Sequence, residues 1–158
     1  ASKTREVRKI PALRSGMPGS GKTTFLRDMI RARSDLGRGS VAVVDEREEI
    51  SGLGFELGEH SDVLSGINKA EGAMMLLRCM NPQIIAMDEI TKASDLEAII
   101  QIAGCGVQIL ATAHGSTVEE LSRRRLYREL LVEGIFKYLI VINGSGSNRV
   151  YKAERIAK

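Results

Sequence analysis

The sequence has few cysteines and no long apolar run, and both shortages limit the class of protein it can be. Its two cysteines, Cys79 and Cys105, lie in apolar stretches without the spacing of metal ligands. We therefore expect buried, reduced thiols. No segment approaches the roughly 18 consecutive apolar residues of a membrane span, and no signal-peptide pattern is present. These shortages argue against a cysteine-bound metal and against a secreted or membrane-spanning protein, and they favour a cytosolic one.

The sequence also lacks a strong charge excess, internal repeats and low-complexity linkers. Its net charge of +3 and pI near 9.0 permit contact with nucleic acid or an acidic membrane face but favour neither. A chain of 158 residues with 43% apolar content can bury one ordinary core. We therefore expect a single domain over residues 1–158.

What the sequence does contain is an alternation of short apolar runs and longer helical periods. The runs are typical of strands buried on both faces, and they cover residues 41–44, 84–87, 107–112 and 138–142. Helical periodicity covers residues 21–33, 69–80, 95–103 and 118–132. The pairs Ser94–Glu97 and Thr117–Glu120 predict capping boxes before the last two helices.

This alternation predicts an α/β fold with a mainly parallel sheet and helices on both faces. A further short strand should precede the glycine-rich turn and start at Ala12, because Pro11 cannot donate to a ladder. Residues 136–156 predict two strands joined by a Gly-Ser turn, antiparallel at the edge of the sheet. Residues 50–68 predict an irregular loop that contains His60. The expected core methionines are Met74, Met75, Met80 and Met87.

A phosphate-binding motif starts at Gly16. The stretch GMPGSGKT fits G-x-x-x-x-G-K-S/T without a mismatch, and a helical pattern follows it. Backbone N–H groups of such a loop surround phosphate oxygens, and the helix directs the positive end of its dipole at them. Lys22 supplies a charge to the outer phosphates, and Thr23 offers a hydroxyl to Mg²⁺. The predicted nucleotide-binding residues are Gly16, Gly19, Ser20, Gly21, Lys22, Thr23 and Thr24.

An acidic pair ends the predicted strand at 84–87. Asp88 can hold the Mg²⁺ shell through a water molecule, and Glu89 can orient and deprotonate an attacking water. Phosphoryl transfer needs mainly positioning and charge neutralisation, which this pair and Lys22 supply. The motifs therefore predict a site for ATP and Mg²⁺.

One strand, residues 41–44, separates the two motifs in sequence. This spacing resembles the RecA-like phosphate-loop class, in which an extra strand lies between the strands that carry the two motifs. In that class the inserted strand follows the acidic pair, which here means residues 107–112. Thr112 and His114 would then end beside the γ-phosphate, where a polar group can sense the third phosphate. A histidine satisfied in the core or solvated in a loop is the alternative.

The segments VDEREEI, NKAEGAMMLLRCMNPQIIAMDEI and ILATAHGS together resemble the stage III sporulation protein AA family, which is related to type II/IV secretion ATPases. The resemblance runs from about Gly16 to Ile156. It implies a RecA-like P-loop NTPase fold, hydrolysis of Mg-ATP, and a ring-shaped hexamer with each nucleotide between subunits. It also implies membrane-associated partners in a secretion-like channel between mother cell and forespore.

The resemblance assigns roles to several residues. An acidic box corresponds to Asp45, Glu46 and Arg47, and an arginine before the acidic strand corresponds to Arg78. A histidine box corresponds to Thr112 with His114. Arg47 and Arg78 are thus the leading candidates for an arginine that acts across subunits, together with the catalytic residues Lys22, Glu89 and His114. Lys69 and Glu71 also match the family, without a mechanism that follows from their chemistry.

The family carries a domain ahead of the phosphate loop, where this chain has little sequence. We therefore expect an ATPase domain that lacks an N-terminal domain. Its expected location is the cytoplasm, including the cytoplasmic face of the membrane on the mother-cell side.

Three functions remain open. The first is an oligomeric motor ATPase coupled to export or channel assembly. The second is an ATP-gated scaffold with little turnover, and the third is a nucleic-acid-stimulated motor of the same fold, although nucleic acid is the less favoured partner. The arginine run 123–125 is either a solvated face or a contact for a partner or anionic lipid.

Overall fold

The computed structural model describes residues 12–16, 21–37, 39–115, 117–144 and 146–156. Their strands form one sheet in the order β3-β2-β4-β5-β1-β6-β7. The strand bounds are β1 Ala12–Gly16, β2 Val41–Asp45, β3 Ser61–Ser65, β4 Ile84–Glu89, β5 Gln108–Ala113, β6 Tyr138–Asn143 and β7 Val150–Arg155. Neighbouring strands are parallel except for β6 and β7, which form an antiparallel hairpin at one edge. This arrangement confirms the predicted fold class.

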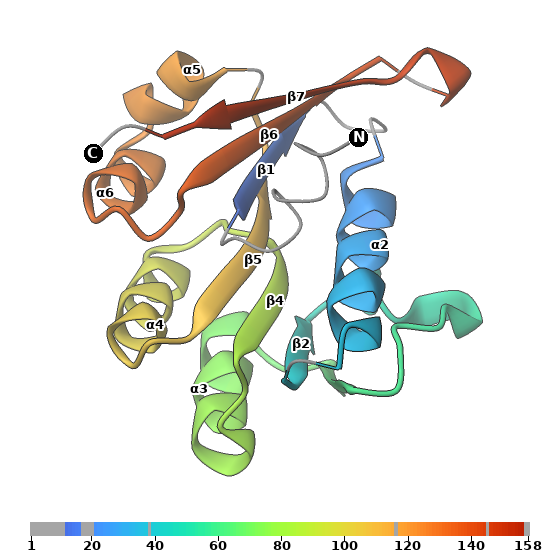
Figure 1. The fold of residues 1–158 in the computed structure, drawn as a ribbon. Helices are drawn as coiled ribbons and strands as arrows, with labels where there is room; N and C mark the ends of the chain where they lie inside the picture. Colours follow the sequence, from blue (N-terminus) through green and yellow to red (C-terminus); the bar gives the residue numbers. More distant parts are fainter. Residues whose placement is uncertain (1–11, 17–20, 38, 116, 145, 157–158) are drawn as a thin grey trace.

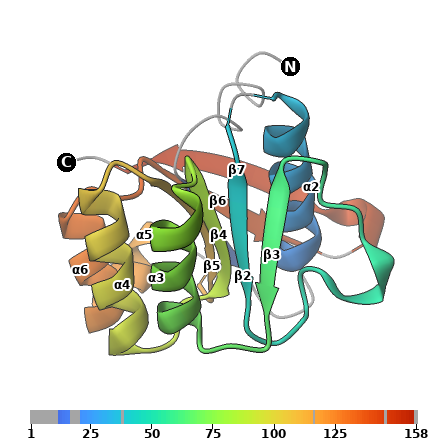
Figure 2. The ribbon, with the colours of Figure 1, turned by 90° about the horizontal axis from the view of Figure 1, so that it is seen from below.

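Helices cover both faces of the sheet, as Figures 1 and 2 show. Helix α2 lies on one face, and α3, α4, α5 and α6 lie on the other. The helix bounds are α2 Lys22–Asp35, α3 Lys69–Met80, α4 Ala93–Gly104, α5 Val118–Arg123 and α6 Arg125–Val132, with short 3-10 turns η1 Gly52–Gly54 and η2 Gly146–Asn148. None of the helices in the described part of the chain is both long and apolar enough to cross a bilayer.

The continuous apolar runs of the central strands supply two cores. In β2, Val41 and Val43 pack with α2, whereas Ala42 and Val44 pack with the cluster under α3 and α4. Successive side chains of a strand point to opposite faces, so a strand covered on both sides is apolar throughout. This is why the strand predictions from apolar runs are confirmed to within two residues at each end.

The strand inserted between the two motif-bearing strands is β5, as predicted. It pairs with β4 on one side and with β1 on the other. The carboxyl ends of these parallel strands therefore meet at one edge of the sheet, where α2 also begins. In open α/β sheets, ligands bind outside this edge.

The start of α4 differs from the prediction. The helix begins at Ala93, and the carboxylate of Asp95 accepts hydrogen bonds from the backbone N–H groups of Thr91 (3.0 Å) and Lys92 (3.1 Å). Within the described residues, Ser94 makes no side-chain capping bond, so the predicted Ser94–Glu97 box is wrong. Asp95 competes better because a carboxylate is a stronger acceptor than a hydroxyl.

The single helix predicted over residues 118–132 is two helices. Thr117 caps α5 as predicted, because its side chain accepts from the N–H of Glu120 at 3.0 Å. The chain then becomes extended at Arg124, whose guanidinium donates to the carbonyl oxygen of His114 at 3.0 Å. The break lets Leu121 and Tyr127 both reach the core from different helices.

Residues 50–68 are not wholly irregular, contrary to the prediction. They include η1 and the edge strand β3, which pairs in parallel with β2. The strand was hard to predict because it is half exposed and glycines flank it. His60 lies in the turn before β3, as expected for a loop residue.

Both cysteines are exposed, so the prediction of buried thiols is wrong. Cys79 lies in the last turn of α3, and Cys105 is the C-cap of α4. An apolar neighbourhood in sequence does not bury a residue on the outer face of a helix.

The methionine prediction is half confirmed. Met87 is buried in β4, and Met74 packs partly against the same core. Met75 and Met80 are 43% and 37% exposed, because they lie on the outer face of α3.

Candidate functional site

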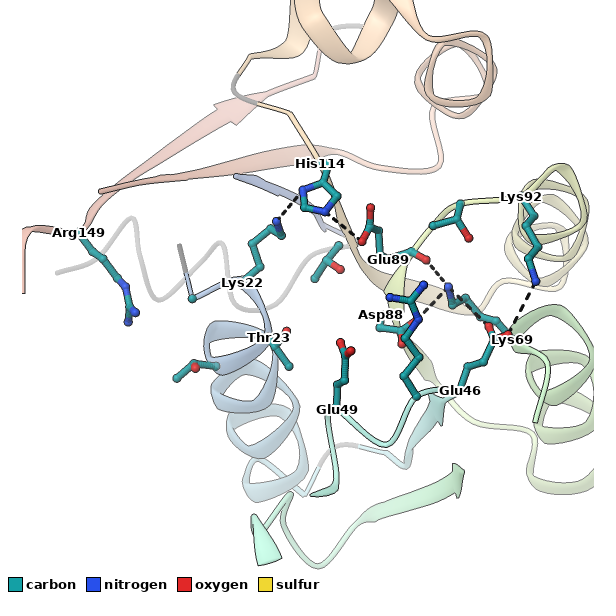
Figure 3. A pocket seen from close by; sticks show the side chains of 15 residues that line it. Lys22, Thr23, Glu46, Glu49, Lys69, Asp88, Glu89, Lys92, His114 and Arg149 are labelled. Atoms are coloured by element: carbon teal, nitrogen blue, oxygen red, sulfur yellow. Dashed lines mark hydrogen bonds and ion pairs between the residues drawn. The ribbon is translucent and has the colours of Figure 1, made fainter. Parts of the chain in front are cut away.

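A pocket of about 510 Å³ opens at the carboxyl edge of the sheet. It is lined by the start of α2, the loop after β2, the β4–α4 connection, the end of β5 and the β6–β7 turn (Figure 3). Gly21, Lys22, Thr23 and Thr24 line it on the α2 side. Gly16 ends β1, whereas Gly19 and Ser20 lie outside the described residues.

Three predicted residues form a continuous chain of contacts in this pocket. The Lys22 ammonium lies 3.1 Å from Nδ1 of His114, and Nε2 of His114 lies 3.2 Å from a carboxylate oxygen of Glu89. An ammonium can only donate, so Nδ1 must accept and Nε2 must carry the proton that it shares with Glu89. The contacts therefore select the neutral Nε2–H tautomer of His114.

Burial changes the proton affinity of the lysine. Desolvation lowers the pKa of Lys22, and the negative charge of Glu89 opposes that effect. An anion placed against Lys22 would likewise favour the charged ammonium. The site is thus electrostatically suited to a negatively charged ligand.

The N-terminus of helix α2 lies at the pocket, and its first residues favour binding of an anion. Its N-cap, Gly21, has φ +89°, a left-handed conformation that L side chains rarely adopt. The first turn of α2 carries no acidic residue, so no carboxylate of that turn offsets the positive end of the helix dipole. Thr23 is half-buried and Thr24 is exposed, and both line the pocket.

The acidic pair at the end of β4 is held by a buried lysine. The ammonium of Lys69, a residue only 4% exposed, lies 2.9 Å from the carboxylate of Asp88 and donates to the backbone carbonyl oxygen of Glu89. It also lies 3.8 Å from Asp95 and 4.0 Å from Glu46. Burial raises the pKa of Asp88, and the hydrogen bond from Lys69 opposes that rise.

The predicted acidic box divides into two roles. Asp45 is fully buried and accepts from the N–H groups of Ile50 (3.1 Å) and Ser51 (2.7 Å), so it folds the loop after β2. The folded loop brings Glu46 and Arg47 into the lining of the pocket. Asp45 therefore shapes the site and does not face it.

Arg78 is not brought to the pocket. It lies exposed in the last turn of α3, whereas Lys69, the first residue of that helix, lines the site. Nine residues of helix separate the two by about 13 Å. Of the two candidate arginines, Arg47 lines the pocket of its own chain and Arg78 does not.

The arginine run 123–125 is exposed, and two of its members are paired. Arg124 lies 3.7 Å from Glu120, and Arg125 lies 3.0 Å from Glu129. Pairing at i, i+4 spacing is typical of a solvated face.

Sequence reasoning missed several lining residues. They are Glu49, Thr91, Lys92 and Arg149, and Lys69 had no assigned mechanism. The sequence position of Lys69 could have indicated that it lines the pocket. Lys69 directly follows Asn68, the N-cap of α3, and α3 follows a strand that ends at the same edge of the sheet. Arg149 comes from the distant β6–β7 turn, and no local pattern indicates it.

The donor set fits Mg²⁺ only if a ligand shares its coordination. No cluster of three or more histidine, cysteine, aspartate or glutamate side chains that could hold a metal occurs in the part of the chain that is described. The Thr23 hydroxyl and the carboxylates of Asp88 and Glu89 nevertheless supply hard oxygens around one pocket. Mg²⁺ commonly takes few protein ligands and completes its shell with phosphates and water.

Comparisons with known proteins identify relatives of this chain. The chain is 35% identical over 145 residues to the stage III sporulation protein AA of Bacillus subtilis (strain 168), covering 85% of this chain and 47% of the relative. It therefore spans about half the length of that curated relative.

Solved structures share the fold. The ATPase DotB of Legionella pneumophila has a TM-score of 0.75 at 20% identity, covering 98% of this chain and 47% of that one. The pilus retraction motor PilT, solved with bound ADP, has a TM-score of 0.76 at 17% identity, covering 100% and 51%. These similarities show a P-loop ATPase fold.

A family model, described as sporulation stage III, protein AA, matches residues 2–153. The match takes in every element from β1 to β6 and most of β7. The chain belongs to the stage III sporulation protein AA family, and its fold is that of the secretion and pilus ATPases.

Proposed function

We propose that this domain binds Mg-ATP in the described pocket and hydrolyses it as a secretion-type ATPase. The observation that carries the proposal is the contact chain from Lys22 through His114 to Glu89 at the start of α2. It combines a cation at a helix N-terminus with a carboxylate beyond it, which is what phosphoryl transfer from a triphosphate needs.

Each residue of the chain has a separate role in this proposal. Lys22 binds the β- and γ-phosphate oxygens, and Gly21 with the backbone of the preceding loop, including Gly16, Gly19 and Ser20, surrounds the phosphates. Glu89 accepts a proton from water as the water oxygen bonds to the γ-phosphorus and the bond to the bridging oxygen of ADP breaks. His114 orients Glu89 through its Nε2–H.

Thr23 and Asp88 would hold Mg²⁺, Thr23 through its hydroxyl and Asp88 through a water molecule. When bound, the ion would neutralise charge on the β- and γ-phosphates. Lys69 holds the Asp88 carboxylate in place, because its ammonium lies 2.9 Å away.

The wider function is proposed from the family. We propose that the domain acts in a homo-oligomeric ring, a hexamer, that drives assembly or export through a membrane-associated sporulation channel from the cytoplasmic side. Arg78, which lies away from its own pocket, is then available to a neighbouring subunit. In the alternative, an ATP-gated scaffold, ATP binding shapes the ring and hydrolysis is not needed for function.

The test compares two variants of the pocket. Lys22→Ala should abolish measurable Mg-ATP binding in calorimetry, because it removes the charged partner of the phosphates. Glu89→Gln should keep Mg-ATP bound while the rate of phosphate release falls by about 10²–10⁴-fold, the range for loss of a general base. Arg31→Ala, an exposed cation on the same helix, is the matched control.

The outcomes separate the alternatives. Unchanged affinity in Lys22→Ala would contradict the site assignment. Unchanged turnover in Glu89→Gln would contradict the role of the base. Normal cellular function of a Glu89→Gln protein that traps ATP would favour the scaffold over the motor, and stimulation of turnover by DNA or RNA, lost at high salt, would favour the nucleic-acid motor.

A further inference from the structure

The β6–β7 turn brings a cation into the pocket from a part of the chain far from every motif. Arg149 follows η2 and immediately precedes β7. Its side chain lines the pocket beside the start of α2, as Figure 3 shows. The hairpin is also packed on α2, since the rings of Tyr151 and Phe25 lie 5.1 Å apart.

Arg149 lies close against the N-cap of α2. A Cβ atom added to Gly21 would lie 2.7 Å from the guanidinium carbon of Arg149. The close approach therefore depends on the absence of a side chain at position 21. The glycine that the phosphate motif requires at this place also makes room for the arginine.

The guanidinium has no anionic partner in the described part of the chain. No ion pair or hydrogen bond joins Arg149 to a described residue, and its Nε atom is buried without an acceptor. Lys69, a buried cation that lines the same pocket, is matched by carboxylates. A partly desolvated guanidinium without an acceptor is costly, and an anion supplied by a ligand would satisfy it.

The position of Arg149 indicates which part of a nucleotide it meets. In Figure 3, His114 and Glu89 lie on one side of Lys22, and Arg149 lies on the other. Under the proposed function, the attacked γ-phosphate lies on the Glu89 side. Arg149 therefore faces the opposite end of the phosphate chain, nearer the nucleoside.

We propose that Arg149 is a nucleotide-binding residue that acts within its own chain and contacts the diphosphate portion common to ATP and ADP. This inference rests on the proposed function, because it assumes a nucleotide in the pocket. It makes the β6–β7 hairpin a part of the site. A guanidinium suits this task because it presents several donors in a fixed plane to phosphate oxygens.

The experiment measures the binding of ADP and of a non-hydrolysable ATP analogue by calorimetry, both with Mg²⁺. Arg149→Ala should weaken both ligands by the same factor, about ten- to hundredfold, as expected for loss of a hydrogen bond to a charged group. Arg149→Lys should retain part of the affinity because it keeps the charge. The matched control is Arg155→Ala, an exposed arginine of β7 that does not line the pocket.

Thermal unfolding without nucleotide distinguishes a ligand-binding role of Arg149 from a role in stabilising the fold. Arg149→Ala should unfold within about 2 °C of the wild type, because no described contact is lost, whereas the affinity falls. Affinity within twofold of the wild type would overturn the inference, and so would a loss confined to the ATP analogue, which would place Arg149 at the γ-phosphate. If wild-type protein bound neither nucleotide, the proposed function would fail as well, and the two failures are thereby distinguishable.

Discussion

Lys69 shows how one buried residue can organise a site through its ion pairs. Its ammonium contacts Asp88 and lies within 4.0 Å of Asp95 and Glu46, so one cation lies among three carboxylates and reduces the repulsion between them. Asp95 in turn caps α4. The lysine therefore connects the end of β4 to the start of the next helix.

Replacement of this lysine should be costly. Lys69→Met should lower the free energy of unfolding by about 3–5 kcal/mol, because it leaves buried carboxylates unpaired. Lys92→Met is the matched control, since Lys92 is exposed and lies 3.9 Å from Glu46. Its cost should stay below about 1 kcal/mol. Urea unfolding of both variants measures the difference, and equal costs would refute the central position of Lys69.

Tyr127 supplies a pH-dependent contribution to stability. Burial raises its pKa to about 12, and its hydroxyl donates to the carbonyl oxygen of Ile90 at 2.7 Å. Between pH 10 and 12 the unfolded chain loses the phenol proton while the native protein keeps it. Stability should therefore fall as pH rises through this window, by roughly 2–3 kcal/mol for this residue.

Tyr127→Phe isolates this effect. At pH 7 the variant should be about 1–2 kcal/mol less stable, because the Ile90 carbonyl oxygen loses its donor. Above pH 10 the wild type loses stability that the variant keeps, so the difference between them should shrink. Denaturant unfolding at pH 7 and pH 11 checks this, and a constant difference would contradict the assignment.

At the scale of single residues, sequence reasoning reached the groups that follow strands directly. Glu89 ends β4 and His114 directly follows β5, so the apolar runs located them. Glu49 and Arg149 depend on how a loop and a distant hairpin fold over α2, which no local pattern indicates. Burial of Lys69 was also unpredictable, because a lysine is ordinarily exposed.

At the scale of elements, helix starts were the least predictable feature. Both Ser94 and Thr117 precede helical periods with a glutamate three residues later. Only Thr117 makes the capping bond. At α4 the acceptor is Asp95, whose position also suits Lys69, so a tertiary contact decided between two locally reasonable caps.

A pair of alanine substitutions tests this difference. Thr117→Ala should cost about 1 kcal/mol of stability, the usual effect of removing an N-cap side chain. Ser94→Ala should cost less than about 0.5 kcal/mol, because Ser94 is exposed and makes no capping bond. Thermal unfolding of the two variants ranks them, and the reverse order would contradict the observed caps.

The central strands could be predicted from the sequence, whereas the edge strand β3 could not. The central ones lie under helices on both faces and are apolar throughout, whereas β3 lies at the edge with a half-exposed pattern. An edge strand needs little hydrophobicity because it buries only part of its surface. Its sequence therefore resembles that of a loop.

At the scale of the molecule, the two ends of α3 face different surroundings. Lys69 lies at the pocket, whereas Arg78 lies about 13 Å further along the helix and is exposed. In a ring, a side chain at that distance can serve a neighbouring pocket but not its own. This geometry makes a role for Arg78 dependent on assembly.

Subunit mixing tests that dependence. Arg78→Ala should leave nucleotide affinity of an isolated chain unchanged, because the residue does not line the pocket. An arginine supplied by a neighbour is worth about 10³–10⁵ in rate in well-studied cases, so oligomer turnover should fall steeply. Mixing Arg78→Ala with Glu89→Gln chains should restore phosphate release above either variant alone. If Arg78→Ala oligomers kept full activity and mixing did not raise phosphate release, a role for Arg78 in a neighbouring pocket would be excluded.

The contact between Lys22 and His114 also has a consequence for the entropy of ligand binding. A lysine ammonium has three N–H donors, so Lys22 can keep its contact with Nδ1 of His114 and still donate to phosphate oxygens. The contact restricts the rotamers of the lysine side chain before a nucleotide binds, so less side-chain entropy remains to be lost on binding. The histidine would thereby preorganise the cation for its ligand.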